Sequence, residues 1–284
     1  MSAISERFAS LAQSHEGALA CYLMGGDPDL DFSRQAVLTA AEAGADIIEV
    51  GIPFSEPIGD GPTIQAAGTR ALAGGATPEG VLRMISQIRR NCDVPIVVMT
   101  YYNIALRPGL RVFARRLADS GVAGVILPDL PVPEAGEWIE QARETGLDTI
   151  FLVSPSSTAE SIREIAAAAA GFVYCVSLMG VTGARDFLAS GIADVVGKIR
   201  AHTSLPVLIG FGVSRPEHVR DACQIADGAV VGSALIDLAA RHYDNRAAAL
   251  KALSRLVTRM KLATKRVQPA GAGRPGQSPE VREE

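Results

Sequence analysis

Eight short apolar runs, each followed by a stretch with helical character, constrain the fold of this 284-residue chain most strongly. The runs are nearly continuous in valine, isoleucine and leucine, as expected for strands that are covered on both faces. Strands interleaved with helices in this way predict parallel βαβ units. The predicted strands cover residues 18–24, 46–50, 95–99, 124–127, 149–153, 172–176, 206–209 and 228–231.

Eight such units in one chain of this length favour an α/β fold closed into a (β/α)₈ TIM barrel. A doubly wound open sheet uses the same alternation, and periodicity does not exclude it. A helix predicted over 4–13, before the first strand, would be an extra element at the bottom of the barrel. A final amphipathic helix is predicted over 244–267. Residues 1–268 are expected to form a single catalytic domain, and the Pro- and Gly-rich residues 269–284 a disordered tail.

Composition excludes several classes of protein. A net charge of −4 without long runs of Lys or Arg argues against a nucleic-acid partner. Four scattered cysteines without CxxC spacing suggest neither a zinc site nor a disulfide framework, and four unclustered histidines are expected at the surface, so no metal is predicted. Neither a secretory signal nor an apolar run of about 18 residues occurs, which predicts a cytoplasmic protein without a membrane span.

Glu49 is the most informative single residue, because it interrupts a predicted strand of isoleucine and valine. Alternation along the strand places it on one face with Ile47 and Gly51. The opposite face would meet the helices, so Glu49 would point into the barrel near the carboxyl end of the strand. Burial there should raise its pKa toward neutrality, as a general acid and base requires. The alternative is a structural glutamate with a backbone or arginine partner.

Asp60 follows in a loop rich in Gly and Pro over the same end of the predicted barrel. An Asp-Gly pair is common in turns, so Asp60 alone carries little functional information. Its position across the barrel mouth from Glu49 makes a catalytic pair plausible. Glu56 in the same loop is expected to be a solvated or interface charge.

Three glycine-bearing segments, 181–184, 210–214 and 232–234, follow the last three predicted strands. Barrels commonly bind phosphate at this corner, where backbone N–H groups and a helix N-terminus face the anion. The alternative is that these glycines only shape tight turns and that Ser214 and Ser233 are ordinary helix caps. Capping boxes are predicted at the helix starts Ser157–Glu160 and Ser214–Glu217. A third helix is predicted to begin at Thr77-Pro78, with Thr77 as its cap.

The segment around Glu49 and Asp60 resembles the signature of tryptophan synthase alpha chains. In that signature a strand ending in Glu-x-Gly is followed by Pro-Phe-Ser-(Asp/Glu)-Pro and then by Asp-Gly-Pro-Thr-Ile-Gln. The resemblance runs from about residue 8 to 262 and includes the motifs Gly26-Asp27-Pro28, Tyr101-Tyr102-Asn103 and Asp129-Leu130-Pro131. It implies a lyase that splits indole-3-glycerol phosphate into indole and glyceraldehyde 3-phosphate in tryptophan biosynthesis.

The resemblance also implies the roles of individual residues. Glu49 would be the general acid and base, and Asp60 would accept a hydrogen bond from the indole N–H. The remaining assignments are phosphate contacts at Gly183, Gly212, Gly232 and Ser233, and substrate contacts at Tyr22, Tyr174, Thr182 and Phe211. Aromatic core packing is the alternative for the two tyrosines and Phe211. Tyr22 stands where many relatives have Phe, and Leu178, near a segment similar to a mobile lid, stands where some have Arg.

Family members work in an α₂β₂ complex, so the resemblance implies a beta-chain partner that carries pyridoxal phosphate, with no cofactor in this chain. The residues that would face the partner are Pro53, Glu56, Pro57, Asn103 and Pro131. Three alternatives remain: a free-standing lyase with the same chemistry, a regulatory subunit with little lyase activity, and a distant phosphate-binding barrel such as a sugar-phosphate isomerase. The last two would not require the pair of Glu49 and Asp60.

Overall fold

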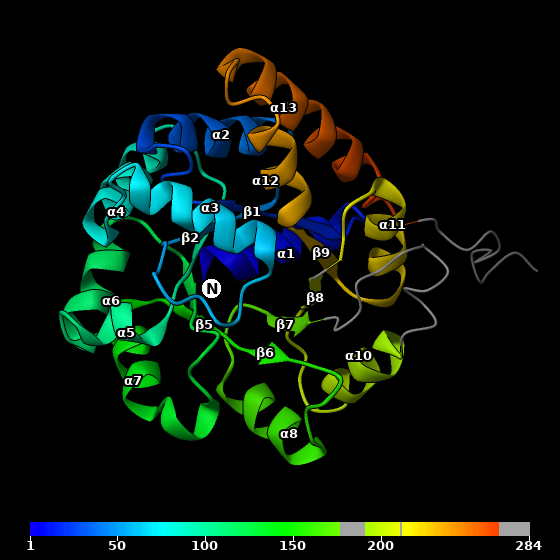
Figure 1. Cartoon of the computed structure of the whole chain (residues 1–284). Coiled ribbons are helices and arrows are strands. Elements are labelled where there is room, and N and C mark those ends of the chain that lie inside the picture. Colours follow the sequence, from blue (N-terminus) through cyan, green and yellow to red (C-terminus); the bar gives the residue numbers. More distant parts are fainter. Residues whose placement is uncertain (177–190, 211, 267–284) are drawn as a thin grey trace, which may run out of the picture.

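The computed structural model of the chain describes residues 1–176, 191–210 and 212–266. In these ranges all paired strands are parallel and belong to one sheet, which helices surround (Figure 1). The strands are β1 (Ala18–Met24), β2 (Ile47–Gly51), β3 (Ile96–Met99), β4 (Gly124–Ile126), β5 (Asp148–Ile150), β6 (Leu152–Val153), β7 (Val173–Val176), β8 (Val207–Gly210) and β9 (Gly228–Val231). Apart from the fifth, the predicted strands are confirmed, with ends shifted by at most one residue.

The sheet closes into a barrel. Its strand order is β5-β4-β3-β2-β1-β9-β8-β7-β6, so β5 and β6 lie at the two ends of this order. These two strands are halves of the single strand predicted over 149–153, interrupted at Phe151. The first half pairs with β4 and the second with β7, so the strand breaks where it changes partner and joins both ends of the sheet. The predicted α/β barrel is thereby confirmed, and the open doubly wound sheet is excluded.

Helices surround the barrel, and all but α1 lie on its outside. They are α1 (Ala3–Gln13), α2 (Leu30–Glu42), α3 (Pro62–Ala73), α4 (Pro78–Arg89), α5 (Tyr102–Leu106), α6 (Leu110–Asp119), η1 (Val132–Glu134), α7 (Gly136–Thr145), α8 (Ala159–Ala168), α10 (Ile192–Arg200), α11 (Pro216–Ile225), α12 (Ser233–Ala240) and α13 (Arg246–Leu262). None of the helices in the described ranges is long and apolar enough to span a membrane.

Two apolar layers hold the fold together, and alternation along β2 separates them. Ile47 belongs to the cluster inside the barrel, whereas Ile48 and Val50 pack in the layer between strands and helices. The predicted helix before the first strand is confirmed as α1. Its Ile4 and Leu11 join the interior cluster, so α1 plugs the end of the barrel where the strands begin.

The N-terminal and C-terminal segments contact each other at this end of the barrel, where the strands begin. Lys261 of α13 contacts Asp46 at 2.9 Å and Glu16 at 2.8 Å, and the Gly17 N–H donates to the Thr264 carbonyl. The predicted final helix extended to residue 267, but α13 ends at Leu262. The helix stops because the following residues leave it to bond with the segment before β1.

Two of the three predicted helix starts are wrong. The Thr77 side chain accepts from the Gly80 N–H at 3.0 Å, as predicted. Helix α8 is instead capped by Thr158, one residue after Ser157, because threonine there faces the first turn. No side chain caps α11, and the Ser214 N–H donates to the His218 ring at 3.3 Å. The expectation of a surface histidine is wrong for His218, which is buried.

Substitution of Phe172 tests how much the interior apolar cluster contributes to stability. Phe172 is 1% exposed and lies 6.2 Å from the ring of Phe8 on α1. Phe172→Ala would leave a cavity where the helix meets the strands, and we expect a loss of about 3–5 kcal/mol in the free energy of unfolding, measured by urea denaturation. The control Leu262→Ala, at a side chain 61% exposed, should change stability by at most about 0.5 kcal/mol. Equal effects of both substitutions would contradict this account of the core.

Candidate active site

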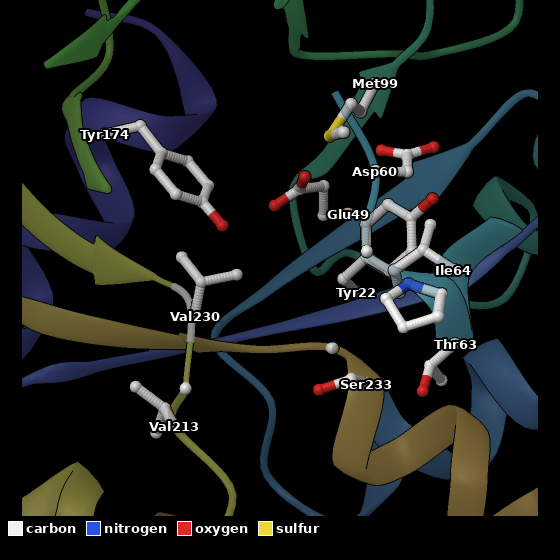
Figure 2. Close-up of a pocket in the computed structure, with 14 residues that line it drawn as sticks. Tyr22, Glu49, Asp60, Thr63, Ile64, Met99, Tyr174, Val213, Val230 and Ser233 are labelled. Atoms are coloured by element: carbon white, nitrogen blue, oxygen red, sulfur yellow. The ribbon is translucent and has the colours of Figure 1, made fainter. Parts of the chain in front are cut away.

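One cavity at the carboxyl ends of the strands collects the predicted site residues. Its volume is about 240 Å³, and the close-up in Figure 2 shows its lining. The predicted residues that line it are Tyr22, Glu49, Asp60, Tyr174, Gly212, Gly232 and Ser233. Thr182, Gly183 and Phe211 lie outside the described residues. Catalytic, aromatic and glycine positions that were predicted separately therefore share one pocket.

Glu49 lies in the middle of this pocket. Its strand β2 is flanked by β1 and β3, which place Tyr22 and Val97 beside it in register. The residue is only 2% exposed, and its Oε2 atom is buried with no hydrogen-bond partner among the described residues. Burial, and then the negative charge of Asp60, raise the pKa of Glu49 from about 4.5 to about 8. The carboxyl is therefore mainly protonated at neutral pH and can give up a proton to a ligand.

Asp60 is held at the pocket mouth by its loop. Burial raises the pKa of Asp60 to about 6, and a hydrogen bond from the Tyr101 side chain opposes that rise. The Tyr101 hydroxyl also accepts from the Gly59 N–H at 3.0 Å, and its ring stacks on Phe54 at 5.2 Å. Asp60 is thus mainly ionised at neutral pH, opposite in charge state to the protonated Glu49.

Tyr101 is a site residue that the sequence reasoning missed. It appeared there only as part of the motif Tyr101-Tyr102-Asn103, without a role. The signal that could have found it is its position two residues after the end of the third strand, at the same end of the barrel as Asp60. Tyr101 itself lies beside the cavity and does not line it; the missed residues that line it are Thr63, Ile64, Met99, Val213 and Val230. Their side chains are mostly apolar, so they give the pocket walls that suit a flat apolar ligand.

Two buried tyrosines flank Glu49 in Figure 2. Tyr22 is 6% exposed and Tyr174 is 8% exposed. Burial, with the nearby carboxyl groups, raises the pKa of both phenols well above the ordinary value, so both stay neutral. A side chain at Gly51 would collide with the Tyr22 hydroxyl, and one at Gly210 with the Tyr174 ring. Glycine at these two strand ends therefore leaves the space that the tyrosine side chains occupy.

The predicted phosphate corner lies in the same pocket. Ser233 is the first residue of α12, and Gly232 precedes it, so the start of this helix, where the first N–H groups have no partner within the helix, lines the cavity. Gly212 has a φ of 77°, a left-handed conformation that favours glycine. No Lys, Arg or His in the described part of the chain lines the cavity, so an anion there would depend on backbone donors.

Helices α3 and α12 meet across the pocket mouth. The Thr63 hydroxyl donates to Asp237 at 3.2 Å. Next to this contact, Arg70 of α3 binds the buried Asp27 through two nitrogens at 2.8 and 2.7 Å, and the Tyr243 hydroxyl donates to the same carboxylate at 2.8 Å.

The described residues contain no cluster of three or more His, Cys, Asp or Glu side chains suited to a metal.

The predicted partner residues lie at the same end of the barrel as the pocket. Glu56, Asn103 and Pro131 are exposed, and Pro57 is half-buried. Pro53 differs, because it is buried directly after Ile52, whose N–H donates to the carbonyl of Met99. Exposed Ile58, 86% accessible, lies in the same loop as Glu56 and adds apolar surface there.

The pKa of Glu49 gives a direct test of the pocket electrostatics. Carbon-detected NMR of the side-chain carboxyl should show Glu49 titrating near 8 in the ligand-free protein. Asp60→Asn should lower this pKa, because the repulsion between two negative charges disappears while the burial of Glu49 remains. Asp129→Asn, at an exposed carboxylate whose partner is the Tyr102 N–H, serves as the control and should leave it unchanged. A Glu49 that titrates near 4.5 would contradict the assigned burial.

Comparisons with known proteins agree with this geometry. The family model of the tryptophan synthase alpha chain matches residues 8–265. The alpha chain of Carboxydothermus hydrogenoformans is 44% identical over 260 residues, which span 92% of this chain and 97% of the relative. The alpha chain of Geobacter sulfurreducens is 46% identical over 238 residues, which span 84% of this chain and 90% of the relative.

Solved structures show the same similarity. Tryptophan synthase from M. tuberculosis superposes with a TM-score of 0.85 at 36% identity, over 93% of this chain and 99% of that chain. Tryptophan synthase subunit alpha from Legionella pneumophila superposes with a TM-score of 0.85 at 32% identity, over 93% and 98%. The chain therefore belongs to the tryptophan synthase alpha chain family, the carbon–carbon lyases that cleave indole-3-glycerol phosphate in tryptophan biosynthesis.

Proposed function

We propose that Glu49 and Asp60 carry out the cleavage of indole-3-glycerol phosphate in the 240 Å³ pocket. The protonated Glu49 carboxyl gives its proton to C3 of the indole ring, and the positive charge that results spreads to N1. The Asp60 carboxylate accepts the N1–H hydrogen bond and stabilises this charge. The observation that carries the proposal is the pair of carboxyl groups in one pocket with opposite protonation states at neutral pH.

The second half of the reaction returns Glu49 to its starting state. The Glu49 carboxylate, formed by the first proton transfer, accepts a proton from the side-chain hydroxyl next to indole C3. The bond between C3 and the side chain then breaks, and its electron pair neutralises the ring. The products are indole and the aldehyde of glyceraldehyde 3-phosphate, and Glu49 is protonated again. A single carboxyl with a pKa near neutrality serves both steps.

The remaining residues would bind the two ends of the substrate. Tyr22 and Tyr174 lie on either side of Glu49 in Figure 2 and would contact the indole ring, with Thr182 and Phe211 assigned to the same end by the resemblance. Gly212, Gly232 and Ser233 would bind the phosphate, with Gly183 assigned by the resemblance. The start of α12 supports the phosphate assignment, since its N–H groups suit an anion. Residues 1–268 would act as one catalytic domain, with 269–284 as a tail outside it.

We further propose an α₂β₂ assembly with a beta chain. Pyridoxal phosphate resides in the beta chain of tryptophan synthase, and the alpha family has no cofactor of its own. The proposed contacts are Glu56, Pro57, Asn103 and Pro131, with Pro53 behind them. The exposure of Glu56, Asn103 and Pro131 beside the pocket mouth supports this assignment, because indole leaving the pocket would reach the partner directly.

Glu49→Gln tests the acid and base role. We expect the rate of indole release from indole-3-glycerol phosphate to fall by about 10²–10⁴-fold, because glutamine keeps the size of the side chain but transfers no proton. The assay should be run with and without a beta chain: a subunit is weak alone and activated by its partner, whereas a free-standing lyase turns over fully by itself. Circular dichroism should show the fold intact.

The control for that measurement is Glu140→Gln, at an exposed side chain on α7, which should retain wild-type turnover. Near-normal indole release by Glu49→Gln would refute the proposed mechanism. Loss of release with retained activation of the beta chain would agree with it and would separate catalysis from assembly.

Ser233→Asp tests the phosphate corner. A carboxylate at the start of α12 would repel the substrate phosphate and occupy the same N–H groups, so we expect KM to rise at least about tenfold with a smaller change in kcat. Ser10→Asp, on the exposed face of α1 at the other end of the barrel, is the matched control and should leave KM unchanged. An unaltered KM in Ser233→Asp would remove this residue from the binding site.

A further inference from the structure

A second cavity lies at the end of the barrel opposite the active site. Its volume is about 320 Å³, and its lining residues are Arg200, Arg220, Cys223, Gln224, Ala226, Lys265 and Arg266. They come from the carboxyl-terminal parts of α10 and α11 and from the residues after α13, which precede or adjoin the starts of β8, β9 and β1. Strands of a parallel barrel all begin at the same end, so this cavity is remote from the catalytic pocket.

Four of the lining side chains are cationic and none is acidic. Asp227, 29% exposed, is the described carboxylate that pairs with lining cations: it binds both Arg200 and Arg266 at 3.3 Å and also accepts from the Val207 N–H. Glu16, bridged to Lys265 through the backbone, directs its carboxylate to Lys261 at 2.8 Å. Among the described residues, two of the four lining cations thus share one carboxylate, and the other two have no acidic partner. Such an excess of positive charge is notable in a chain whose net charge is −4.

Two of the cations have structural roles. Arg200 is the last residue of α10, and Arg266 donates to the carbonyl of Ala226 at the end of α11, so each compensates the negative end of a helix. Arg220 and Lys265 have no such explanation. Neither side chain forms an ion pair or hydrogen bond with another residue of the described ranges. Gln224 lies one helical turn after Arg220, on the same face of α11, and adds a neutral amide donor.

We infer that this basic cavity, defined by Arg200, Arg220, Lys265 and Arg266, binds a small polyanion of the diphosphate class. Three arginines favour phosphate, because the planar guanidinium donates two parallel hydrogen bonds to phosphate oxygens. The volume exceeds what a single phosphate group fills, which favours two linked phosphates over one. Bound there, the ligand would join α10, α11 and the segment after α13 without entering the catalytic pocket.

Inorganic pyrophosphate is the probe, titrated calorimetrically into the full chain at low ionic strength. Wild-type protein should bind it, and higher salt should weaken the binding because the contacts are ionic. The double variant Arg220→Gln/Lys265→Gln should bind at least about tenfold more weakly. The matched control Arg83→Gln/Lys251→Gln removes two exposed cations elsewhere and should bind as wild type does. Each single variant repeats the test if the double variant fails to fold.

Pyrophosphate could also enter the catalytic pocket, so the titration is repeated with Ser233→Asp, which blocks the proposed phosphate corner. Binding that persists in Ser233→Asp and is lost in Arg220→Gln/Lys265→Gln supports the basic cavity. Binding that is lost only in Ser233→Asp overturns it. Binding seen only after the chain is shortened to end at Arg266 also overturns it, since the residues beyond 266 would then be the competing occupant. Equal affinity for monophosphate would overturn the diphosphate assignment.

Discussion

Keeping an ionisable carboxyl group inside an apolar barrel is the condition on which the active site depends. Glu49 is 2% exposed, and no described cation pairs with it. Because ionisation there is costly, the proton stays on the group until a ligand or a change in the neighbouring charge removes it. The apolar interior cluster and α1 exclude water from the end of the barrel where the strands begin, and they thereby keep Glu49 in an apolar environment. The fold therefore sets the protonation state, and not merely the position, of the acid.

Asp60 depends on a different environment. Its loop lies at the rim, and Tyr101 binds both Asp60 and the Gly59 backbone. Hydrogen bonding offsets part of the effect of burial, so this carboxyl ionises below neutral pH while Glu49 ionises above it. Two residues only eleven positions apart in sequence thus acquire opposite charge states through their surroundings. The proposed mechanism needs that separation, because one group must donate a proton while the other stabilises a cation.

Much of this arrangement followed from local sequence. Continuous apolar runs predicted the strands, and the period of two placed Glu49 inside the barrel, because both signals arise from burial on the two faces of a strand. The break at Phe151 was missed, since a change of pairing partner leaves no mark on composition. The capping error at Ser157 came from an adjacent threonine that can make the same bond. Tyr101 and the basic cavity were missed because they depend on residues brought together only by the closed barrel.

Gly51 and Gly210 show how strictly the shape of the pocket limits change in the chain. Neither contributes a functional group, yet any side chain at these positions would occupy the volume that Tyr22 and Tyr174 now fill. The two aromatic walls can therefore be lost through substitutions at positions that do not line the cavity. Evolution of a wider or narrower specificity in this scaffold would have to begin with the tyrosines themselves, because the strand ends beneath them leave no room for compensation.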